Sequence, residues 1–239
     1  PEVPGFSTGD RVAYTVPNGG YATHRLVPAA SLVQLPDPIS DAQAAAIVLK
    51  GLTACYLLHD SYRVSAGEVV LFHAAAGGVG SLAGHWLKAK GVRAIGTAGG
   101  PEKSERAKAH GFDEVIDYRS EDFAERVMAL TAGQGVDAVY ESVGKDTIMG
   151  SLACLKTFGT LVSFGQSSGL PDQFRVAHLA RGSFHLTRTV LFHYTEDRGW
   201  LERSSKTVCE AVAAGAVEIH GDSRLPLRRA WQAHQDLED

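Results

Sequence analysis

The chain has 239 residues, with 23 Lys and Arg against 27 Asp and Glu, so its net charge is -4. This length allows one large domain or two modest ones, and the 44% hydrophobic and 21% charged fractions exclude disordered, collagen-like and coiled-coil proteins. Because there is no basic excess, binding to nucleic acid or to an anionic membrane surface is disfavoured. Glycine, with 26 residues, is the one excess.

The sequence gives no support for a membrane span, a secretion leader or a zinc framework. The longest apolar stretch, Ala44–Leu49, ends at Lys50, well short of the roughly 20 residues that a span requires. Three cysteines lie far apart without paired spacing, namely Cys55, Cys154 and Cys209. Such a sparse, odd count is typical of a reducing compartment, so we predict a cytoplasmic protein without a metal site. Because the chain begins at Pro1 rather than Met, we interpret it as a piece of a longer protein.

Residues 1–38 predict short strands separated by glycine turns, as in a fragment of an antiparallel sheet or a β-barrel. The predicted runs and the turn between them are Arg11–Val16, Tyr21–Val27 and Asn18–Gly20. At Ser40 the pattern changes, because Ser40 and Gln43 have the spacing of a capping box, in which each side chain satisfies a helix N-terminal N–H group. The alanine-rich stretch from there to Leu58 predicts one or two helices.

From Gly67 to Phe164 apolar strands alternate with helices. The predicted strands are Glu68–His73, Arg93–Thr97, Glu114–Asp117, Asp137–Tyr140 and Thr160–Phe164. The predicted helices are Val79–Lys90, Glu102–His110, Asp122–Leu130 and Thr147–Leu155. Apolar strands joined by helices require a parallel sheet that is covered on both faces. The sequence therefore predicts an α/β fold with a doubly wound parallel sheet.

After Phe164 the alternation stops. The predicted elements of the last part are a turn-rich loop, an apolar run with β character, an amphipathic helix, a strand and a final helix: Gln166–Asp172, Ser183–Phe192, Trp200–Ala214, Val217–Ile219 and the segment from Leu227. None of them continues the regular strand-helix alternation.

A glycine-rich turn joins the first of these strands to the helix after it. Ala75-x-Gly77-x-x-Gly80 matches the dinucleotide-binding fingerprint, with alanine in its first place. Gly77 allows a pyrophosphate to approach, Gly80 allows the helix to pack on the strand, and the helix N-terminus offers N–H groups to the anion. A tight structural turn is the alternative, but the strand before the motif and the βαβ series after it favour a dinucleotide site.

The end of the second strand indicates which dinucleotide is bound. Enzymes that bind the free ribose of NAD usually have Asp or Glu about 20 residues after the motif, whereas Thr97–Pro101 contains two glycines and no acid. Glu102 lies one turn into the helix, with Lys103 beside it. A lysine next to small glycines suits a ribose 2′-phosphate, so we predict NADPH rather than NADH. The alternative is a solvated lysine near a helix start, where the helix dipole disfavours it.

The sequence resembles the quinone oxidoreductases of the zeta-crystallin type, a family in the medium-chain dehydrogenase/reductase superfamily. The resemblance covers nearly the whole chain and rests on Gly9–Val12, Leu49–Thr53 with Tyr56, Phe72–Gly80, Val115–Tyr118, Glu141–Gly144 and Val162–Gly165. It implies a Rossmann sheet inserted into a partial, β-rich GroES-like catalytic domain. The implied divisions are 1–48 (catalytic domain, N-terminal part missing), 49–188 (NADPH-binding domain) and 189–239 (catalytic domain again, C-terminal end missing).

The resemblance also implies which residues line a cofactor cleft. Lys103 and Tyr118 correspond to the pair that grips the adenosine 2′-phosphate. The pyrophosphate turn and the adenosine-side loop correspond to Gly77, Gly78, Val79, Gly80, Gly99 and Gly100. The positions toward the nicotinamide are Thr53, Tyr56, Ser142, Val143, Phe164, Gly165, Gln166, Ser167, Arg188, Thr189, Val190 and Leu191. Gln166 replaces the family's usual Asn, so the resemblance does not extend to that side-chain contact. Alternative roles are helix packing for Thr53 and Tyr56 and a surface ion pair for Arg188.

A zinc alcohol dehydrogenase of the same superfamily needs Cys and His ligands and a cysteine-rich lobe, and this sequence has no such spacing. His73, beside the fingerprint, is interpreted as a strand residue at the core edge rather than as an acid or base. No catalytic side chain is predicted, because a quinone is already a strong electron acceptor and water can protonate its reduced oxygen. The cofactor then carries the chemistry.

The predicted function is therefore NADPH-dependent reduction of a small quinone, with single-electron and hydride transfer left open. One alternative is an NADPH-dependent enone or alkenal (enoyl) reductase on the same scaffold. An alternative of another class is a non-catalytic, crystallin-like or RNA-binding protein that binds NADPH, and the net charge argues against RNA. The resemblance also implies a homodimer formed through edge strands, with Ser183–Phe192 as the candidate edge, although burial within the chain explains that run equally well.

Overall fold

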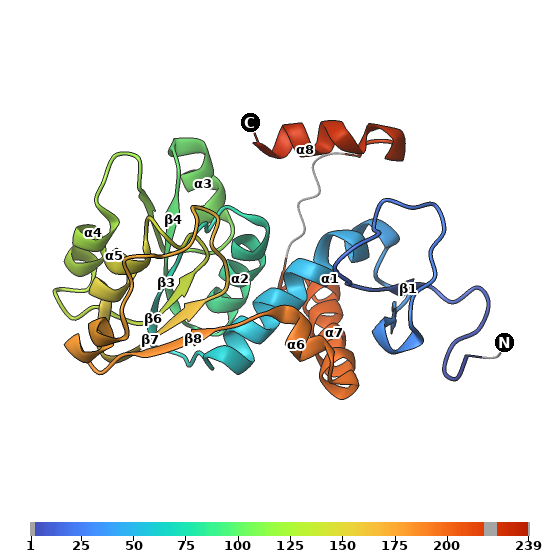
Figure 1. Cartoon of the computed structure of the whole chain (residues 1–239), viewed down its shortest axis with the longest axis horizontal. Helices are drawn as coiled ribbons and strands as arrows, with labels where there is room; N and C mark the ends of the chain where they lie inside the picture. The colour runs from blue at the N-terminus through green and yellow to red at the C-terminus, as the bar shows by residue number, and fades with distance from the viewer. Residues whose placement is uncertain (1–2, 218–223, 239) are drawn as a thin grey trace.

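A computed structural model describes residues 3–217 and 224–238, and its main body is a six-stranded sheet with helices on both faces (Figure 1). The strands are β3 Val69–Phe72, β4 Arg93–Ala98, β5 Glu114–Asp117, β6 Val136–Glu141, β7 Leu155–Ser163 and β8 His185–Arg188. All neighbours are parallel, in the order β5-β4-β3-β6-β7-β8. This is the order of a dinucleotide-binding doubly wound fold, so the predicted Rossmann sheet is confirmed.

The order of the strands creates a switch point between β3 and β6. From β3 the chain winds outward through β4 to β5, then returns to the other side of β3 and continues from β6 to β8. Phe72 pairs with Gly96 on one side and with Tyr140 on the other. In open parallel sheets, ligands bind beyond the carboxyl ends of the strands at such a point. The loops after β3, β4, β6, β7 and β8 therefore form the candidate site.

Helices cover both faces because side chains along each strand alternate in direction. Val70 and Phe72 join the core cluster that includes α1, α2 and α7, whereas Leu71 joins the cluster that includes α4 and α5. Figure 1 places α4 and α5 at the left of the sheet and α1, α2 and α7 at its right. The helices are α1 Asp41–Tyr56, α2 Gly78–Ala89, α3 Pro101–Ala109, α4 Phe123–Leu130, α5 Ile148–Ala153, α6 Leu191–Thr195, α7 Arg198–Ala213 and α8 Ala230–Glu238.

The first of these helices begins where the sequence indicated. The Ser40 hydroxyl accepts a hydrogen bond from the Gln43 N–H at 3.3 Å, and the Gln43 side-chain oxygen accepts one from the Ser40 N–H at 2.9 Å, which confirms the capping box. With the π-helical turn that follows it, α1 forms a segment, Asp41–Ser61, long and apolar enough by composition to cross a membrane. Most of its apolar side chains are in the core against α2 and α7, although Leu49 is 51% exposed, and a Cβ on Gly51 would lie 2.6 Å from Val208. Packing inside the protein therefore explains its apolar composition.

The prediction for the N-terminal residues is wrong in its details. The run at Arg11–Val16 forms a strand only at β1, Val12–Ala13, and Tyr21–Val27 forms none. The partner of β1 is β2, Val33–Gln34, in an antiparallel pair. Val33 is buried, whereas Tyr21 and Leu26 are 66% and 99% exposed. Because a two-stranded ribbon depends on burying one face, only the residues that pack on α1 and α7 stay paired.

The later elements agree better with the sequence. The loop Gln166–Asp172, the helix at α7 and the helix after Leu227 are confirmed, the last beginning with the short 3₁₀ turn Leu227–Arg229. Ser183–Phe192 is only partly extended, because β8 ends at Arg188 and α6 follows. The predicted helix Thr147–Leu155 is too long, since β7 already starts at Leu155. Val217 is not in a strand, and the rest of the predicted strand there lies outside the described residues.

Candidate functional site

The fingerprint turn lies between β3 and α2, at the switch point. Gly77 is the N-cap of α2, and the N–H groups of Gly78, Val79 and Gly80 form its first turn. Such N–H groups have no acceptor within the helix, and the described residues supply none. A Cβ on Gly80 would lie 2.6 Å from the carbonyl oxygens of Ala74 and Ala75, so the turn requires glycine there. These three N–H groups and the positive end of the helix dipole suit an anion.

Lys50 of α1 also reaches this turn, which the sequence reasoning did not predict. A Cβ on Gly78 would lie 2.6 Å from the Lys50 Cε and 2.9 Å from its Nζ. The lysine side chain therefore lies against the first residue of α2 and brings a cation to the same place. The signal in the sequence was its position, one helical turn before the predicted site residue Thr53.

Beyond β4 and β5 the structure brings Asp117, Tyr118 and Arg119 to the glycine loop that follows β4. Asp117 Oδ1 accepts hydrogen bonds from the N–H groups of Gly100 at 2.9 Å and Arg119 at 3.0 Å, and these bonds hold the pKa of Asp117 below its ordinary value. A Cβ on Gly99 would lie 2.5 Å from the Tyr118 hydroxyl and 3.3 Å from Arg119 Nε. Lys103 is exposed in the first turn of α3, the helix that begins directly after Gly100.

Arg119 and Asp117 are contributions that the sequence reasoning missed. Both are adjacent to the predicted Tyr118, but their position depends on the pairing of Ala98 with Asp117 between β4 and β5. That pairing sets the end of β5 beside the glycine loop. The result is an arginine and a phenol hydroxyl beside a glycine backbone, with the exposed Lys103 in the first turn of the next helix. Cations and a hydroxyl donor of this kind suit a phosphate monoester.

At the opposite end the loops after β6 and β7 are joined to each other. The carbonyl of Ser142 accepts from the Ser167 N–H at 3.2 Å, and the carbonyl of Val143 accepts from the Ser168 N–H at 2.8 Å. A Cβ on Gly165 would lie 2.5 Å from the Ser142 carbonyl oxygen, so these backbones nearly touch. The loop continues from Phe164 through the exposed Gln166. The structure thus brings the predicted residues Ser142, Val143 and Phe164–Ser167 together.

The residues after β8 extend the same edge. The Thr189 N–H donates to the Ser163 carbonyl at 3.0 Å, and Arg188 Nη1 donates to the Thr189 carbonyl at 2.9 Å. Thr189 Oγ1 is buried. Val190 is partly exposed, whereas Leu191 is buried in the core. The Tyr56 phenol is a hydrogen-bonding neighbour of the Thr189 hydroxyl, so the end of β8 contacts α1 here.

The two predicted residues of α1 are less open to a ligand. Tyr56 is 2% exposed and its ring stacks on Tyr194, with 4.6 Å between ring centroids. Burial raises the pKa of its phenol, and the neighbouring Thr189 hydroxyl partly opposes that shift. The Thr53 hydroxyl donates to the carbonyl of Leu49 in its own helix at 2.8 Å. Both contacts are those of the alternative role, in which these side chains pack a helix.

His73 is not at the edge of the core, as the sequence suggested, but 1% exposed just beyond β3. Its ring nitrogens lie 3.0 Å from Thr97 Oγ1 and 2.9 Å from Ser151 Oγ. Burial lowers its pKa, and the nearby Glu141, itself fully buried, opposes that shift. The correction arises because Ser151 of α5 and the Phe123 ring of α4 pack on the imidazole, which strand periodicity does not show.

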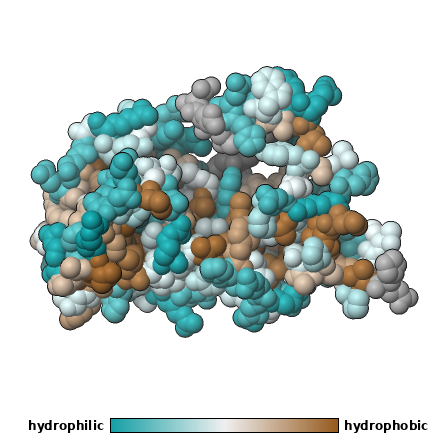
Figure 2. Space-filling view, viewed as in Figure 1, coloured by the Kyte–Doolittle hydropathy of each residue, from teal (hydrophilic) through white to brown (hydrophobic). Residues whose placement is uncertain are grey.

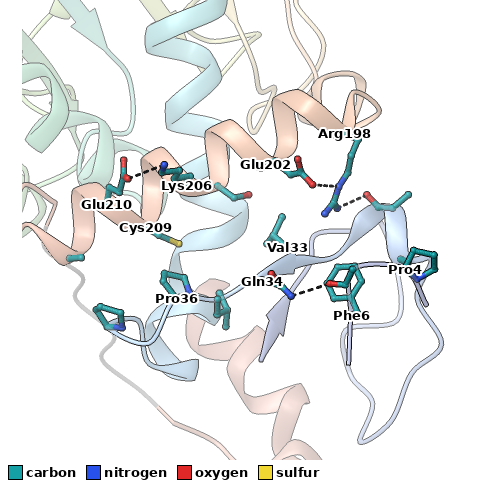
Figure 3. A pocket seen from close by; sticks show the side chains of 17 residues that line it. Pro4, Phe6, Val33, Gln34, Pro36, Arg198, Glu202, Lys206, Cys209 and Glu210 are labelled. Atoms are coloured by element: carbon teal, nitrogen blue, oxygen red, sulfur yellow. Dashed lines mark hydrogen bonds and ion pairs between the residues drawn. The ribbon is translucent and has the colours of Figure 1, made fainter. Parts of the chain in front are cut away.

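The described residues contain no group of three His, Cys, Asp or Glu side chains that could hold a metal ion. A cavity of about 1140 Å³ lies elsewhere, between α7 and the N-terminal residues (Figure 3). Figure 3 shows its α7 wall with the ion pairs Arg198–Glu202 and Lys206–Glu210, and Phe6 and Val33 opposite. The fingerprint turn and the loops after β4, β6 and β7 do not line it, so this cavity is separate from the candidate dinucleotide site.

The order of the sheet, its switch point and the free N–H groups at the start of α2 together define a dinucleotide-binding α/β protein. Comparison with known proteins identifies the family within this class. The zinc-binding dehydrogenase family matches residues 78–204. A quinone oxidoreductase of Pseudomonas aeruginosa is 44% identical over 99% of this chain and 73% of its own length. A 2-haloacrylate reductase of a Burkholderia species is 41% identical over 98% of this chain and 72% of its own length. The solved structure of Escherichia coli quinone oxidoreductase complexed with NADPH has 41% identity and a TM-score of 0.94, over 99% of this chain and 74% of that one.

The chain belongs to the quinone oxidoreductase family of the medium-chain dehydrogenase/reductase superfamily. The resemblance seen in the sequence is thereby confirmed.

Proposed function

We propose that this chain uses NADPH to reduce quinones. The observation that carries the choice of cofactor is the end of β4, where two glycines replace the acid that an NAD enzyme would have. Arg119 and the Tyr118 hydroxyl lie against that loop, and Lys103 is in the first turn of the helix that follows it; these groups suit a 2′-phosphate. Relatives at 41–44% identity are quinone oxidoreductases, one of them solved with NADPH, which favours a quinone as acceptor.

NADPH, when bound, supplies the reducing equivalents. The chain's own residues bind and orient: the first turn of α2 and Lys50 would hold the pyrophosphate, and Lys103, Tyr118 and Arg119 the 2′-phosphate. The joined loops after β6 and β7 would set the place of the nicotinamide. Because water can protonate the reduced quinone oxygen, no side chain is assigned as proton donor. Single-electron and hydride transfer both fit this arrangement.

Purified protein is expected to oxidise NADPH in the presence of 1,2-naphthoquinone, measured as loss of absorbance of the reduced nicotinamide. NADH should be a much poorer reductant, because it lacks the phosphate that Lys103 and Arg119 would hold. The same assay without quinone serves as the control for oxidation by oxygen. No quinone-dependent oxidation across a panel of benzoquinones and naphthoquinones would contradict the proposal.

A second candidate function, reduction of activated alkenes, is favoured by one observation. The Burkholderia relative at 41% identity is a 2-haloacrylate reductase, and a haloacrylate carries a carbon–carbon double bond conjugated to a carboxylate. The ratio of kcat/KM for 1,2-naphthoquinone to that for a 2-haloacrylate or a simple enone separates the two functions. A ratio below one would make alkene reduction the better assignment.

We also propose a homodimer formed through β8, the edge strand of the sheet. Around this edge, Phe158, Val176 and Leu186 are 69%, 77% and 37% exposed, and Figure 2 shows apolar side chains gathered over this end of the molecule. An unpaired edge with apolar neighbours favours pairing with a second copy. Light scattering after gel filtration should give twice the 25.4 kDa chain mass, and Leu186→Asp should reduce it toward one chain. Wild-type protein at a single chain mass would refute the dimer.

We propose two further properties of the protein, its division into domains and its location. One is the division into a partial catalytic domain at 1–48, an NADPH-binding domain at 49–188 and a return to the catalytic domain at 189–239. The packing of α7 on both α1 and β2 supports contact between the first and last parts. The other is a cytoplasmic location, supported by three free, buried cysteines.

A further inference from the structure

A chain of buried polar side chains runs beneath the cofactor edge, and the proposed reaction does not use it. Glu141, at the end of β6, is fully buried. Its Oε2 accepts from the Ser151 hydroxyl at 2.6 Å. Ser151 Oγ lies 2.9 Å from His73 Nε2, and His73 Nδ1 lies 3.0 Å from Thr97 Oγ1. All four side chains are at most 1% exposed. The chain joins β6, α5, β3 and β4, and therefore spans the switch point.

The other oxygen of Glu141 holds the loop that follows β6. Oε1 accepts from the N–H groups of Val143 at 2.7 Å and Gly144 at 3.0 Å. The Thr147 hydroxyl lies 2.9 Å from Oε1 and 2.8 Å from Oε2. A buried carboxylate is costly unless donors surround it, and here every partner is a donor. These charge-assisted bonds fix the backbone of Val143, a predicted cofactor residue.

The charge of Glu141 also gives the hydrogen-bond chain a direction. The carboxylate can only accept, so the Ser151 hydroxyl must donate to it. Ser151 Oγ is then left to accept from His73, which requires the proton on Nε2. His73 Nδ1 is in turn an acceptor, and the Thr97 hydroxyl donates a hydrogen bond to it. The Phe123 ring packs perpendicular to the imidazole, with 5.0 Å between ring centroids, and helps to bury it.

We propose that Glu141 is a positioning residue for the loop after β6 and that its charge fixes His73 as the neutral Nε2–H tautomer. The first half rests on the proposed function, because the loop is taken to contact NADPH. The second half concerns the protein alone.

Glu141→Gln tests both halves with little change of volume. The amide oxygen can still accept hydrogen bonds from the Val143 and Gly144 N–H groups, but the amide nitrogen then donates to Ser151. Ser151 must turn its own proton toward His73 Nε2, and His73 must become the Nδ1–H tautomer, donating to Thr97. The direction of every hydrogen bond from position 141 to Thr97 is then reversed. Because a neutral amide is a weaker acceptor than a carboxylate, the NADPH dissociation constant is expected to rise about three- to tenfold.

The tautomer is read from the ¹⁵N shifts of the imidazole nitrogens, without cofactor, with the His73 signals identified by their loss in His73→Gln. Wild type should show Nε2–H and Glu141→Gln should show Nδ1–H. Glu114→Gln is the matched control, since Glu114 pairs with Arg93 at the start of β5, far from the carboxyl edge. It should change neither the tautomer nor NADPH affinity. Glu141→Leu, which leaves two N–H groups without an acceptor, is expected to lose more than the glutamine variant, in thermal stability as well as affinity.

Each outcome decides one half. Nδ1–H or imidazolium in the wild type, or no change of tautomer in Glu141→Gln, overturns the directed chain. A switched tautomer with unchanged NADPH affinity overturns the positioning role of Glu141 but supports the directed chain of hydrogen bonds. Wild-type protein that binds no NADPH defeats the proposed function and the positioning role together, while the tautomer result still stands on its own.

Discussion

Lys103→Ala is expected to weaken NADPH binding by about 1.5–3 kcal/mol, the scale of a hydrogen bond to a charged group, and to leave NADH binding nearly unchanged. Lys103 is exposed in the first turn of α3 and no described residue pairs with it, so its removal costs the folded chain little. Titrations of both cofactors by calorimetry or fluorescence measure the effect.

Lys108→Ala is the matched control, because Lys108 lies in the last turn of the same helix and pairs with Glu105. It should affect neither cofactor. If Lys103→Ala lost NADPH and NADH affinity equally, the lysine would act on a part common to both, and its assignment to the 2′-phosphate would be wrong. Arg119→Ala separates the two cations, and a smaller but still NADPH-specific loss is expected from it.

Gly80→Ala should destabilise the fold and reduce binding of both dinucleotides. The added methyl group would lie 2.6 Å from two backbone oxygens, those of Ala74 and Ala75, which cannot rotate away. The start of α2 must shift, and its free N–H groups shift with it. Overpacking of this kind typically costs about 1–3 kcal/mol. We expect that loss in the free energy of unfolding, and at least a tenfold rise in both dissociation constants, since about 1.4 kcal/mol corresponds to tenfold.

Gly20→Ala is the control for the general effect of replacing a glycine, because a Cβ there would meet no atom within 4 Å. Denaturant unfolding and cofactor titration should leave this variant close to wild type. A Gly80→Ala protein with wild-type stability and NADPH affinity would mean that the turn adapts, and the requirement for glycine at that position would not hold.

The sheet was predictable because its signals are local. Each apolar strand is followed by a helix, and the fingerprint marks the first crossover, so the strand ends that carry Gly99, Ser142 and Phe164 could be placed from sequence alone. Parallel order then brings those ends to one edge, whatever the details of packing. This is why most of the candidate site could be named without coordinates.

The contributions that were missed depend on contacts between distant segments. Arg119 reaches the glycine loop only through the register of β4 with β5, and Lys50 reaches the fingerprint only through the packing of α1 beside α2. His73 looked like an ordinary strand residue because its partners, Ser151 and Glu141, lie 78 and 68 positions further along. The N-terminal strands failed for a similar reason, since the pairing segment was β2 rather than the nearer run.

The contact between Gly99 and Tyr118 constrains how cofactor preference could change. An acid at the end of β4 is the usual route to NAD, yet any side chain at position 99 would begin 2.5 Å from the Tyr118 hydroxyl. Tyr118 is 54% exposed, so its ring can swing aside, but its hydroxyl then leaves the glycine loop. A single acidic replacement at position 99 would therefore add a group that suits NADH and displace one that suits NADPH in the same step.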